Sequence, residues 1–150
     1  MSRTPQSLQQ SEHFTAAGFG APAQWREFVL DHPRRGKVDG KVFLGSTLGL
    51  TGMEVSFGAM LPGESQPFLH AHQQNEELYV FLSGTGEMQV DGRRIPLVPG
   101  TAVRIAPAGV RAWRATGTEP LAYLVIQVKA GSLEQATAQD GIRPDQPLVW

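Results

Sequence analysis

The chain has 150 residues, a length that favours one domain with a single sizeable core. Its net charge of −1 at pH 7 provides no general attraction to nucleic acid or to a membrane surface. The absence of cysteine excludes disulfides, thiolate metal ligands and a cysteine nucleophile. The longest strongly apolar run, Leu121 to Ile126, is too short to cross a bilayer, and the polar N-terminus lacks the pattern of a secretion signal. We therefore expect a cytoplasmic protein with no nucleic-acid or membrane partner.

Residues 1–24 are predicted to form an N-terminal arm outside the main domain. They are polar or small and include Gly18, Gly20 and Pro22 near their end. Two interpretations of the arm remain open: a loose segment, or a strand that becomes ordered only against a partner subunit. A first strand is predicted at residues 25–30.

Residues 25–130 are predicted to form the main domain, because short apolar segments alternate with turn residues as in an antiparallel sandwich or barrel. In the segment 53–61, the apolar side chains fall on one face, which is predicted to face the core. Asp91-Gly92 indicates a two-residue hairpin turn. The segment 121–128 is apolar on both faces, so we expect both to be covered, one of them by a second subunit. Further strands are predicted at 78–82, 87–90 and 101–105.

The best helix signal lies in the C-terminal residues 131–150. Ser132 to Gln135 has the pattern of a capping box, which predicts a short helix that ends near Gly141. Pro144 and Pro147 favour an irregular segment after it. We expect this helix and the following tail to pack on the barrel.

Two histidines and a carboxylate lie within eight positions, at His70, His72 and Glu77. Side chains two residues apart on a strand point the same way, so both imidazoles would face one side. Glu77 can return to the same place if the polar stretch 73–75 forms a bend. Such a set can hold a divalent ion such as Fe, Mn, Ni or Zn. The alternative interpretation is a polar loop with two solvated histidines.

Several neighbouring side chains are candidates for a ligand pocket. Tyr79 and Phe81 share the parity of Glu77 along the predicted strand, so we expect them to line a pocket below it. Gln66 is a further candidate at the mouth of that pocket.

A basic and aromatic cluster follows, with Arg111 and Trp113 as candidate ligand-binding residues beside Arg104 and Arg114. One interpretation is recognition of a carboxylate or an aromatic acid by guanidinium pairing and stacking. The other is a barrel exterior with extended arginines and a tryptophan that covers the core or a dimer interface. Strand alternation favours the second interpretation, because it distributes these side chains over both faces.

The segment around the histidines resembles the first motif of the cupin superfamily: Gly, about five residues, His-x-His, three or four residues, Glu, six residues, Gly. The matching positions here are Gly63, His70, His72, Glu77 and Gly84. The resemblance covers roughly residues 40–130 and implies an all-β fold, a double-stranded β-helix or jelly-roll barrel of the RmlC-like type that is usually a homodimer. It also implies a metal ion inside the barrel, bound by the two histidines and the glutamate. Glu76 competes for the ligand role, and we favour Glu77 because its spacing to Gly84 fits.

The second cupin motif is degenerate in this chain. Its family pattern ends in Pro-x-Gly, two residues, His, three residues and Asn, but here Ala112 stands at the histidine place and Thr116 at the asparagine place. A one-residue shift brings Arg111 to the histidine place, so neither register supplies a fourth ligand. Three consequences stay open: a metal ion held by three ligands, weak metal binding with histidines that act directly on a ligand, or entry of Arg111 into the cavity. In the last case its charge would repel a cation and attract an anion.

Two functional hypotheses follow. The first is a small barrel protein, non-catalytic or weakly catalytic, that binds a divalent metal ion, a small-molecule ligand or both in its interior. The alternative is a metal-dependent enzyme of dioxygenase or isomerase type with a two-histidine, one-carboxylate site. Because the cupin fold hosts many reactions, the resemblance selects neither.

Overall fold

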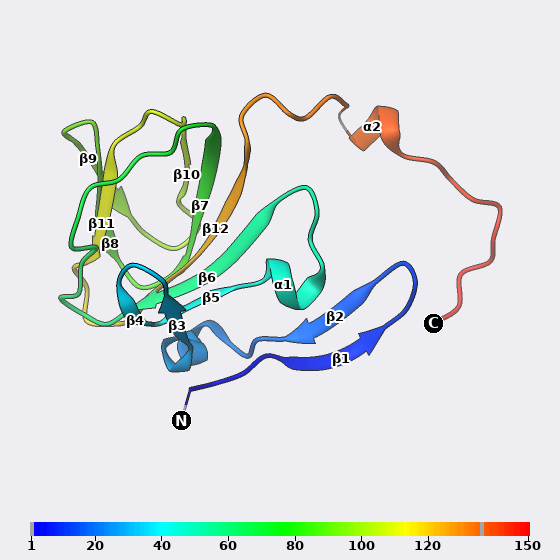
Figure 1. Cartoon of the computed structure of the whole chain (residues 1–150), viewed down its shortest axis with the longest axis horizontal. Helices are drawn as coiled ribbons and strands as arrows, with labels where there is room; N and C mark the ends of the chain where they lie inside the picture. The colour runs from blue at the N-terminus through cyan, green and yellow to red at the C-terminus, as the bar shows by residue number, and fades with distance from the viewer. Residues whose placement is uncertain (1, 136) are drawn as a thin grey trace.

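The computed structural model describes residues 2–135 and 137–150 and shows a barrel of two sheets with two additional hairpins (Figure 1). The large sheet has the order β10-β7-β12-β6-β5, with β5 (Lys41–Phe43), β6 (Glu54–Met60), β7 (Asn75–Ser83), β10 (Ala102–Ile105) and β12 (Leu121–Lys129). The small sheet has the order β11-β8-β9, with β8 (Gly86–Val90), β9 (Arg93–Leu97) and β11 (Arg111–Ala115). The hairpins are β1 (Gln6–Gln10) with β2 (Thr15–Gly18), and β3 (Val29–His32) with β4 (Gly36–Asp39). The short helices are η1 (Pro22–Glu27, a 3₁₀ helix), α1 (Gly45–Leu48) and α2 (Thr137–Asp140).

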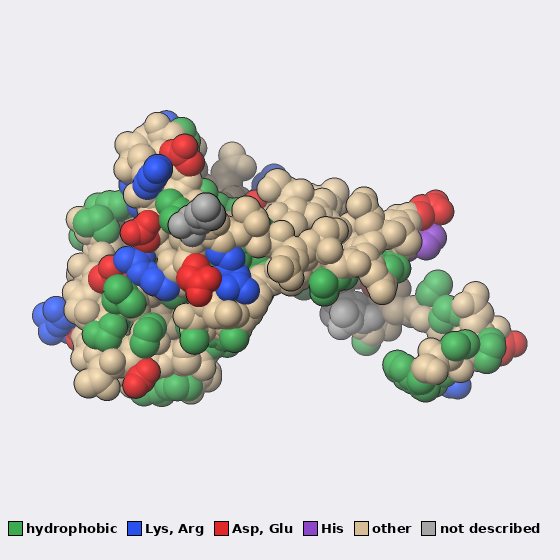
Figure 2. Space-filling model, turned by 90° about the horizontal axis from the view of Figure 1, so that it is seen from below, with side chains coloured by type: hydrophobic (Ala, Val, Ile, Leu, Met, Phe, Trp, Pro, Cys, Tyr) green, Lys and Arg blue, Asp and Glu red, His purple; other side chains and the backbone are tan. Residues whose placement is uncertain are grey.

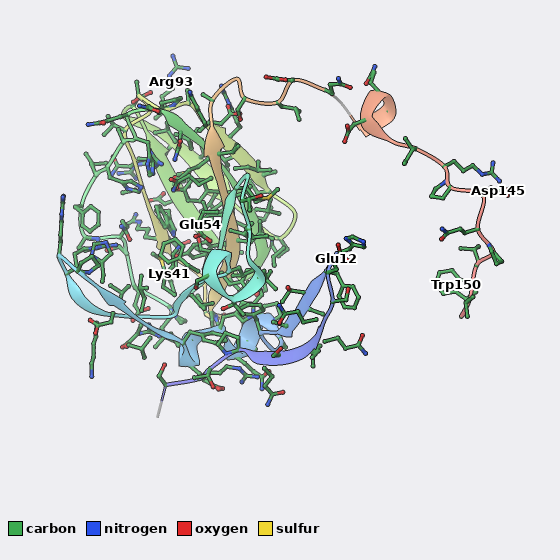
Figure 3. All side chains as sticks on the ribbon, turned by 45° about the vertical axis from the view of Figure 1, so that its right-hand side comes forward. Glu12, Lys41, Glu54, Arg93, Asp145 and Trp150 are labelled. Atoms are coloured by element: carbon green, nitrogen blue, oxygen red, sulfur yellow. The ribbon has the colours of Figure 1, made fainter. Side chains whose placement is uncertain are left out.

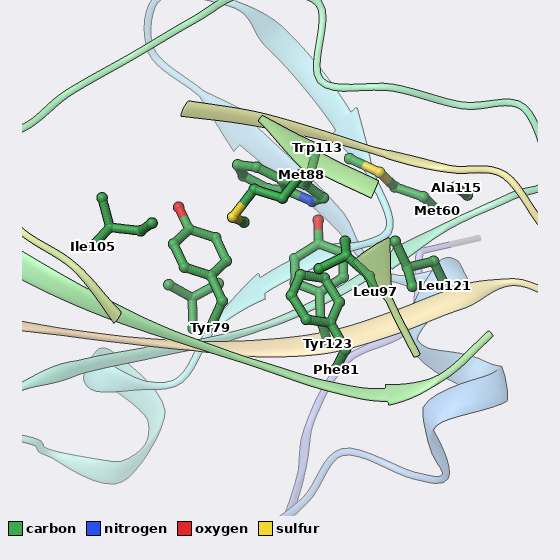
Figure 4. Packing of buried hydrophobic residues seen from close by; sticks show 11 residues of the cluster. Met60, Tyr79, Phe81, Met88, Leu97, Ile105, Trp113, Ala115, Leu121 and Tyr123 are labelled. Carbon is green, nitrogen blue, oxygen red and sulfur yellow. The ribbon is translucent and has the colours of Figure 1, made fainter. Parts of the chain in front are cut away.

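The barrel interior is filled by apolar side chains from both sheets (Figure 4). Tyr79 and Phe81 of β7 and Met88 of β8 are at most 1% exposed, and Trp113 of β11 packs among them. The segment before β7 continues the small sheet, since isolated bridges pair Ser65 with Arg114 and His70 with Arg111. The predicted all-β barrel is therefore confirmed, and the histidine segment lies alongside β11.

Strand β6 faces the barrel interior with its less apolar side, contrary to the sequence prediction. Ser56 is 3% exposed in the interior, and the Tyr123 ring fills the space that a side chain at Gly58 would need. On the opposite side, Phe57 stacks on Trp25 of η1 with ring centroids 4.0 Å apart. The apolar face of β6 is thus covered by the N-terminal segment of the same chain, which leaves the small side chains to border the interior.

The N-terminal segment is ordered against its own barrel. Residues 6–18 form the β1–β2 hairpin, and Phe19, Trp25 and Phe28 are buried in a second apolar cluster that includes Ala122 of β12. Trp25 lies in a 3₁₀ helix and β3 begins only at Val29, so the predicted strand at 25–30 is shorter and later. The two-sided apolar character of β12 is explained by this cluster and by the barrel core, and no second subunit is needed for it.

The C-terminal tail differs from the prediction. The helix α2 covers Thr137–Asp140, the capping-box segment 132–135 is not helical, and the tail projects away from the barrel (Figure 1). Residues 138–150 are exposed, and Figure 2 shows hydrophobic side chains on the projecting segment. A short helix is stabilised mainly by packing of an apolar face, and the nearby Leu133 and Ile142 are 84% and 90% exposed. Among the described residues, no helix is long and apolar enough to cross a membrane.

Candidate functional site

The three residues predicted as metal ligands converge on one place inside the barrel. One ligand atom from each of His70, His72 and Glu77 lies within 4.8 Å of the others. The backbone of His70 exchanges two hydrogen bonds with Arg111 of β11, at 3.0 and 3.2 Å, and the His72 N–H donates to the Pro107 carbonyl at 2.9 Å. Glu77 comes from β7 in the facing sheet. The bend between His72 and β7 thus joins the two sheets and brings both histidines to the carboxylate.

The two oxygens of the Glu77 carboxylate have different partners. Its Oε2 accepts hydrogen bonds from Tyr79 Oη, at 2.6 Å, and from Arg111 Nη2. Its Oε1 lies 3.2 Å from His72 Nε2 and accepts a hydrogen bond from Gln127 Nε2 at 3.1 Å. Burial alone would raise the pKa of Glu77, but the hydrogen bonds from Tyr79 and Arg111 and the Arg111 charge hold it below its usual range. Glu77 is therefore ionised, with one oxygen fixed and the other directed toward His72.

Glu76 points the other way. Its carboxylate accepts a hydrogen bond from Arg104 Nε at 2.7 Å, and the Arg104 side chain is 61% exposed. Adjacent residues on a strand project to opposite faces, so only one of the two glutamates can face the interior. In this structure that residue is Glu77.

Arg111 enters the barrel, one of the three consequences that the sequence left open. The side chain is 1% exposed and pairs with Glu77. Its Nη1 donates to the Gly109 carbonyl at 3.0 Å, and its Nε donates to Tyr79 Oη at 3.3 Å. The guanidinium thus lies directly against the carboxylate of the proposed ligand set, where its fixed charge opposes a bound cation and compensates Glu77.

The basic and aromatic cluster divides between the two faces of the barrel. Trp113 is buried like Arg111, whereas Arg104 and Arg114 project outward to pair with Glu76 and Glu87. The exterior interpretation is therefore right for Arg104 and Arg114 and wrong for Arg111 and Trp113.

Two buried polar atoms in this region have no hydrogen-bond partner among the described residues, His70 Nδ1 and Trp113 Nε1. Burial lowers the pKa of His70 to about 4, and the nearby Arg111 charge contributes in the same direction. His70 is thus a neutral imidazole, the form that binds a metal ion. An unpartnered buried polar atom is costly, which indicates that His70 Nδ1 is available to a bound species.

A cavity of about 910 Å³ borders this cluster. Its lining includes the predicted residues Gln66, His70, His72, Glu77, Tyr79 and Trp113. Phe81 is not part of it: the side chain is fully buried and packs against Tyr123, with ring centroids 5.7 Å apart, so its prediction as a pocket residue is wrong. Arg111 lies behind Glu77 and does not line the cavity either.

Two further residues of the cavity were not among the candidates predicted from the sequence. Lys41 of β5 lines it, and its Nζ donates to Ser56 Oγ at 2.8 Å. Gln127 of β12 also lines the cavity and holds Glu77. The sequence signal for this wall is the polar parity of β6, which includes Ser56 and lies opposite the face that was predicted to meet the core.

A family model for the cupin domain matches residues 57–127. A solved cupin protein from Bacteroides fragilis is 47% identical, over 69% of this chain and 88% of that chain, with a TM-score of 0.67. The chain belongs to the cupin superfamily. In this cupin the first motif provides the His70, His72 and Glu77 cluster, and Arg111 projects inward from the second.

Two further solved cupin-like neighbours carry more specific descriptions. A candidate sugar phosphate isomerase from Acidithiobacillus ferrooxidans is 30% identical, over 59% of this chain and 58% of that chain, with a TM-score of 0.55. A DMSP lyase from Ruegeria pomeroyi is 27% identical, over 64% of this chain and 48% of that chain, with a TM-score of 0.53. No curated protein sequence matches the chain.

The donor set of this cupin fits a divalent ion. It combines a neutral imidazole with a free buried nitrogen, a second imidazole and an ionised carboxylate that directs Oε1 toward His72. The Arg111 charge is the feature that opposes such an ion.

Proposed function

We propose that this cupin binds a small molecule in its cavity, beside a divalent metal ion held by His70, His72 and Glu77. The observation that carries the proposal is the convergence of the three ligand atoms within 4.8 Å at the border of a cavity of about 910 Å³. A cavity of this size can enclose a metabolite-sized ligand. The bound ion would supply a Lewis acid for an oxygen atom of that ligand.

The surrounding residues orient the ligand set and keep it ionised. Tyr79 and Arg111 fix Oε2 of Glu77, which leaves Oε1 as the oxygen for the ion. Burial and the Glu77 charge raise the pKa of Tyr79, so its hydroxyl remains a hydrogen-bond donor. Such outer contacts commonly set the orientation and affinity of metal ligands.

A second candidate function is metal-dependent catalysis of isomerase, lyase or dioxygenase type. It is favoured by the descriptions of two solved neighbours, a candidate sugar phosphate isomerase and a DMSP lyase. The two-histidine, one-carboxylate set leaves coordination positions open for a substrate, as catalysis requires.

Metal content tests the proposal. Tag-free protein, the His70→Ala/His72→Ala variant and a His13→Ala control, which changes an exposed histidine, are compared by inductively coupled plasma mass spectrometry. We expect Fe, Mn, Ni or Zn near one equivalent in the wild type and the control, and less than a tenth of that in the double variant. A wild-type protein that is empty and takes up none of these ions when they are added would contradict the metal proposal.

We further propose, as the family resemblance implies, that the protein is a homodimer and acts in the cytoplasm. Light scattering coupled to size exclusion tests the dimer: a mass near twice the 16.3 kDa of one chain supports it, and a mass near 16.3 kDa contradicts it.

A further inference from the structure

The wall of the cavity near the β3–β4 hairpin is basic. Arg34, Arg35, Lys37 and Lys41 line it, and none of them forms a salt bridge within the described part of the chain. Four positive side chains thus gather on one wall of a protein whose net charge is −1.

The carboxylates of the same cavity already have other partners. Glu77 pairs with Arg111, and Glu64 pairs with Arg26 at 2.7 Å. Asp39 lies 3.8 Å from Arg26, and Glu54 accepts the backbone N–H of Gly45 at 2.7 Å. Arg26 and Arg111 balance two of these four carboxylates, so the four basic side chains of the wall outnumber the two that remain and leave this region with a net positive charge.

Lys41 is the most constrained of these cations. It is half-buried, its Nζ is 2.8 Å from the hydroxyl oxygen of the buried Ser56, and it lies 5.3 and 5.9 Å from the Phe43 and Tyr123 ring centroids. Burial lowers its pKa to about 8 and the Arg35 charge lowers it further, against the opposing effects of Glu77 and Glu54. Lys41 is still mostly protonated at neutral pH, so the fold holds two cations near each other, and neither forms a salt bridge among the described residues.

Arg35 is an exposed residue that lines the same cavity. Its guanidinium lies over the Phe68 ring, 4.7 Å from the centroid, and both residues line the cavity. A guanidinium held on an aromatic face keeps its N–H groups free for an acceptor. Lys41 and Arg35 therefore present donors to the same space.

We propose that the ligand of this cavity is an anion whose carboxylate or phosphate group is bound by Lys41 and Arg35. This inference rests on the proposed ligand-binding function and adds the chemical class of the ligand. Lys41 is on β5 and Glu77 on β7, with β6 and β12 between them in the sheet, which separates the two strands by at most about 14 Å. A ligand several bonds long can thus place its anionic group at Lys41 and an oxygen near the histidines and Glu77.

The test uses metal-free, ¹⁵N-labelled full-length protein, kept in chelator and titrated separately with inorganic phosphate, malonate and neutral glycerol. We expect phosphate, malonate or both to produce saturable shifts of the Lys41, Ser56 and Arg35 amide signals, and glycerol to produce none. The anion that binds more tightly identifies the group as a phosphate or a carboxylate. Absence of saturable shifts with both anions would overturn the inference.

Two variants test the assignment to these side chains. Lys41→Met keeps an unbranched apolar side chain of nearly the same size without the ammonium group, and Arg35→Gln changes an exposed residue. Each is expected to weaken anion binding about tenfold or more, because each removes a charged hydrogen-bond donor. The matched control is Arg93→Gln, on the β8–β9 hairpin away from Lys41 (Figure 3). Unchanged binding in both variants, or an equal loss in the control, would overturn the assignment.

The outcome is distinguishable from failure of the metal proposal, because the titration is done without metal. Anion binding by a protein that takes up no metal ion would support the inference and contradict only the metal site. Metal binding without anion binding would do the reverse.

Discussion

Replacement of Arg111 by methionine tests the ion pair at the centre of the site. The Arg111 and Glu77 side chains are 1% and 7% exposed. Removing one partner of a buried pair leaves an uncompensated charge and costs about 3–5 kcal/mol. In a domain of this size, 1 kcal/mol corresponds to about 2–4 °C in Tm, so Arg111→Met is expected to melt roughly 10 °C lower than the wild type in chelator.

The same substitution removes the charge that opposes a cation. A divalent ion can then replace the guanidinium as the partner of Glu77, so metal ions should stabilise Arg111→Met more than they stabilise the wild type. At a free concentration one hundred times its Kd, the ion adds about 2.7 kcal/mol to the free energy of unfolding. Thermal denaturation at pH 7.5, in chelator and with excess Zn²⁺ or Mn²⁺, measures both effects.

The matched control is Arg104→Met, which breaks the pair with Glu76 on the outside of the barrel. The Arg104 side chain is 61% exposed, and an exposed pair contributes at most about 1 kcal/mol. If Arg111→Met is as stable in chelator as Arg104→Met, the buried pair does not stabilise the fold. If metal ions raise the Tm of Arg111→Met no more than that of the wild type, Arg111 does not oppose the cation.

Three further predictions concern the cavity and the fold. Burial lowers the pKa of Lys41 from 10.5 to about 8, so the protonated amine destabilises the folded state. Lys41→Met should therefore stabilise the protein by about 1–2 kcal/mol at pH 7, after allowance for solvent at the half-buried amine. In denaturant titrations this gain should persist below pH 8 and vanish above about pH 10.5. Trp25→Ala should lower the free energy of unfolding by about 3–5 kcal/mol through loss of its stack on Phe57, and a loss below 1 kcal/mol would contradict the role of the N-terminal cover. Both Gly63 and Gly84 have positive φ, 83° and 72°, but only a Cβ at Gly84 meets the Pro120 backbone. Gly84→Ala should therefore cost clearly more than the roughly 1 kcal/mol expected for Gly63→Ala, and equal Tm values would refute this steric argument.

The side of β7 on which Glu77 lies was predictable, because side chains alternate between the two faces along the whole strand. Alternation along β7 places Glu77 and Tyr79 inside and Glu76 outside, as the structure shows. The same alternation did not place Phe81 correctly, because it indicates the face of the strand and not how far along the barrel axis the side chain lies. Phe81 is far enough along the strand to lie in the closed core rather than at the cavity.

The sequence pattern could not identify the cavity wall at β6, because both faces of this strand are covered. Its apolar face meets the N-terminal segment, and its small side chains border the cavity. Local alternation indicates which face is more apolar, but the partner of each face depends on residues distant in the chain, such as Trp25. Lys41 was missed for the same reason, since its hydrogen-bond partner Ser56 lies on the face that was not predicted to meet the core.

The substitution of arginine for a fourth ligand connects the two proposals. A typical cupin histidine would add a neutral donor, whereas Arg111 adds a positive charge beside Glu77. With Glu77 compensated in this way, a bound divalent ion would leave the cavity with excess positive charge, to which Lys41 and Arg35 contribute further. An anionic ligand would relieve this excess, so the ion and the anion should bind with positive coupling. Titration of phosphate or malonate with and without Zn²⁺ measures that coupling: a lower Kd in the presence of the ion is expected, and an unchanged or higher Kd would show that Arg111 does not link the two sites.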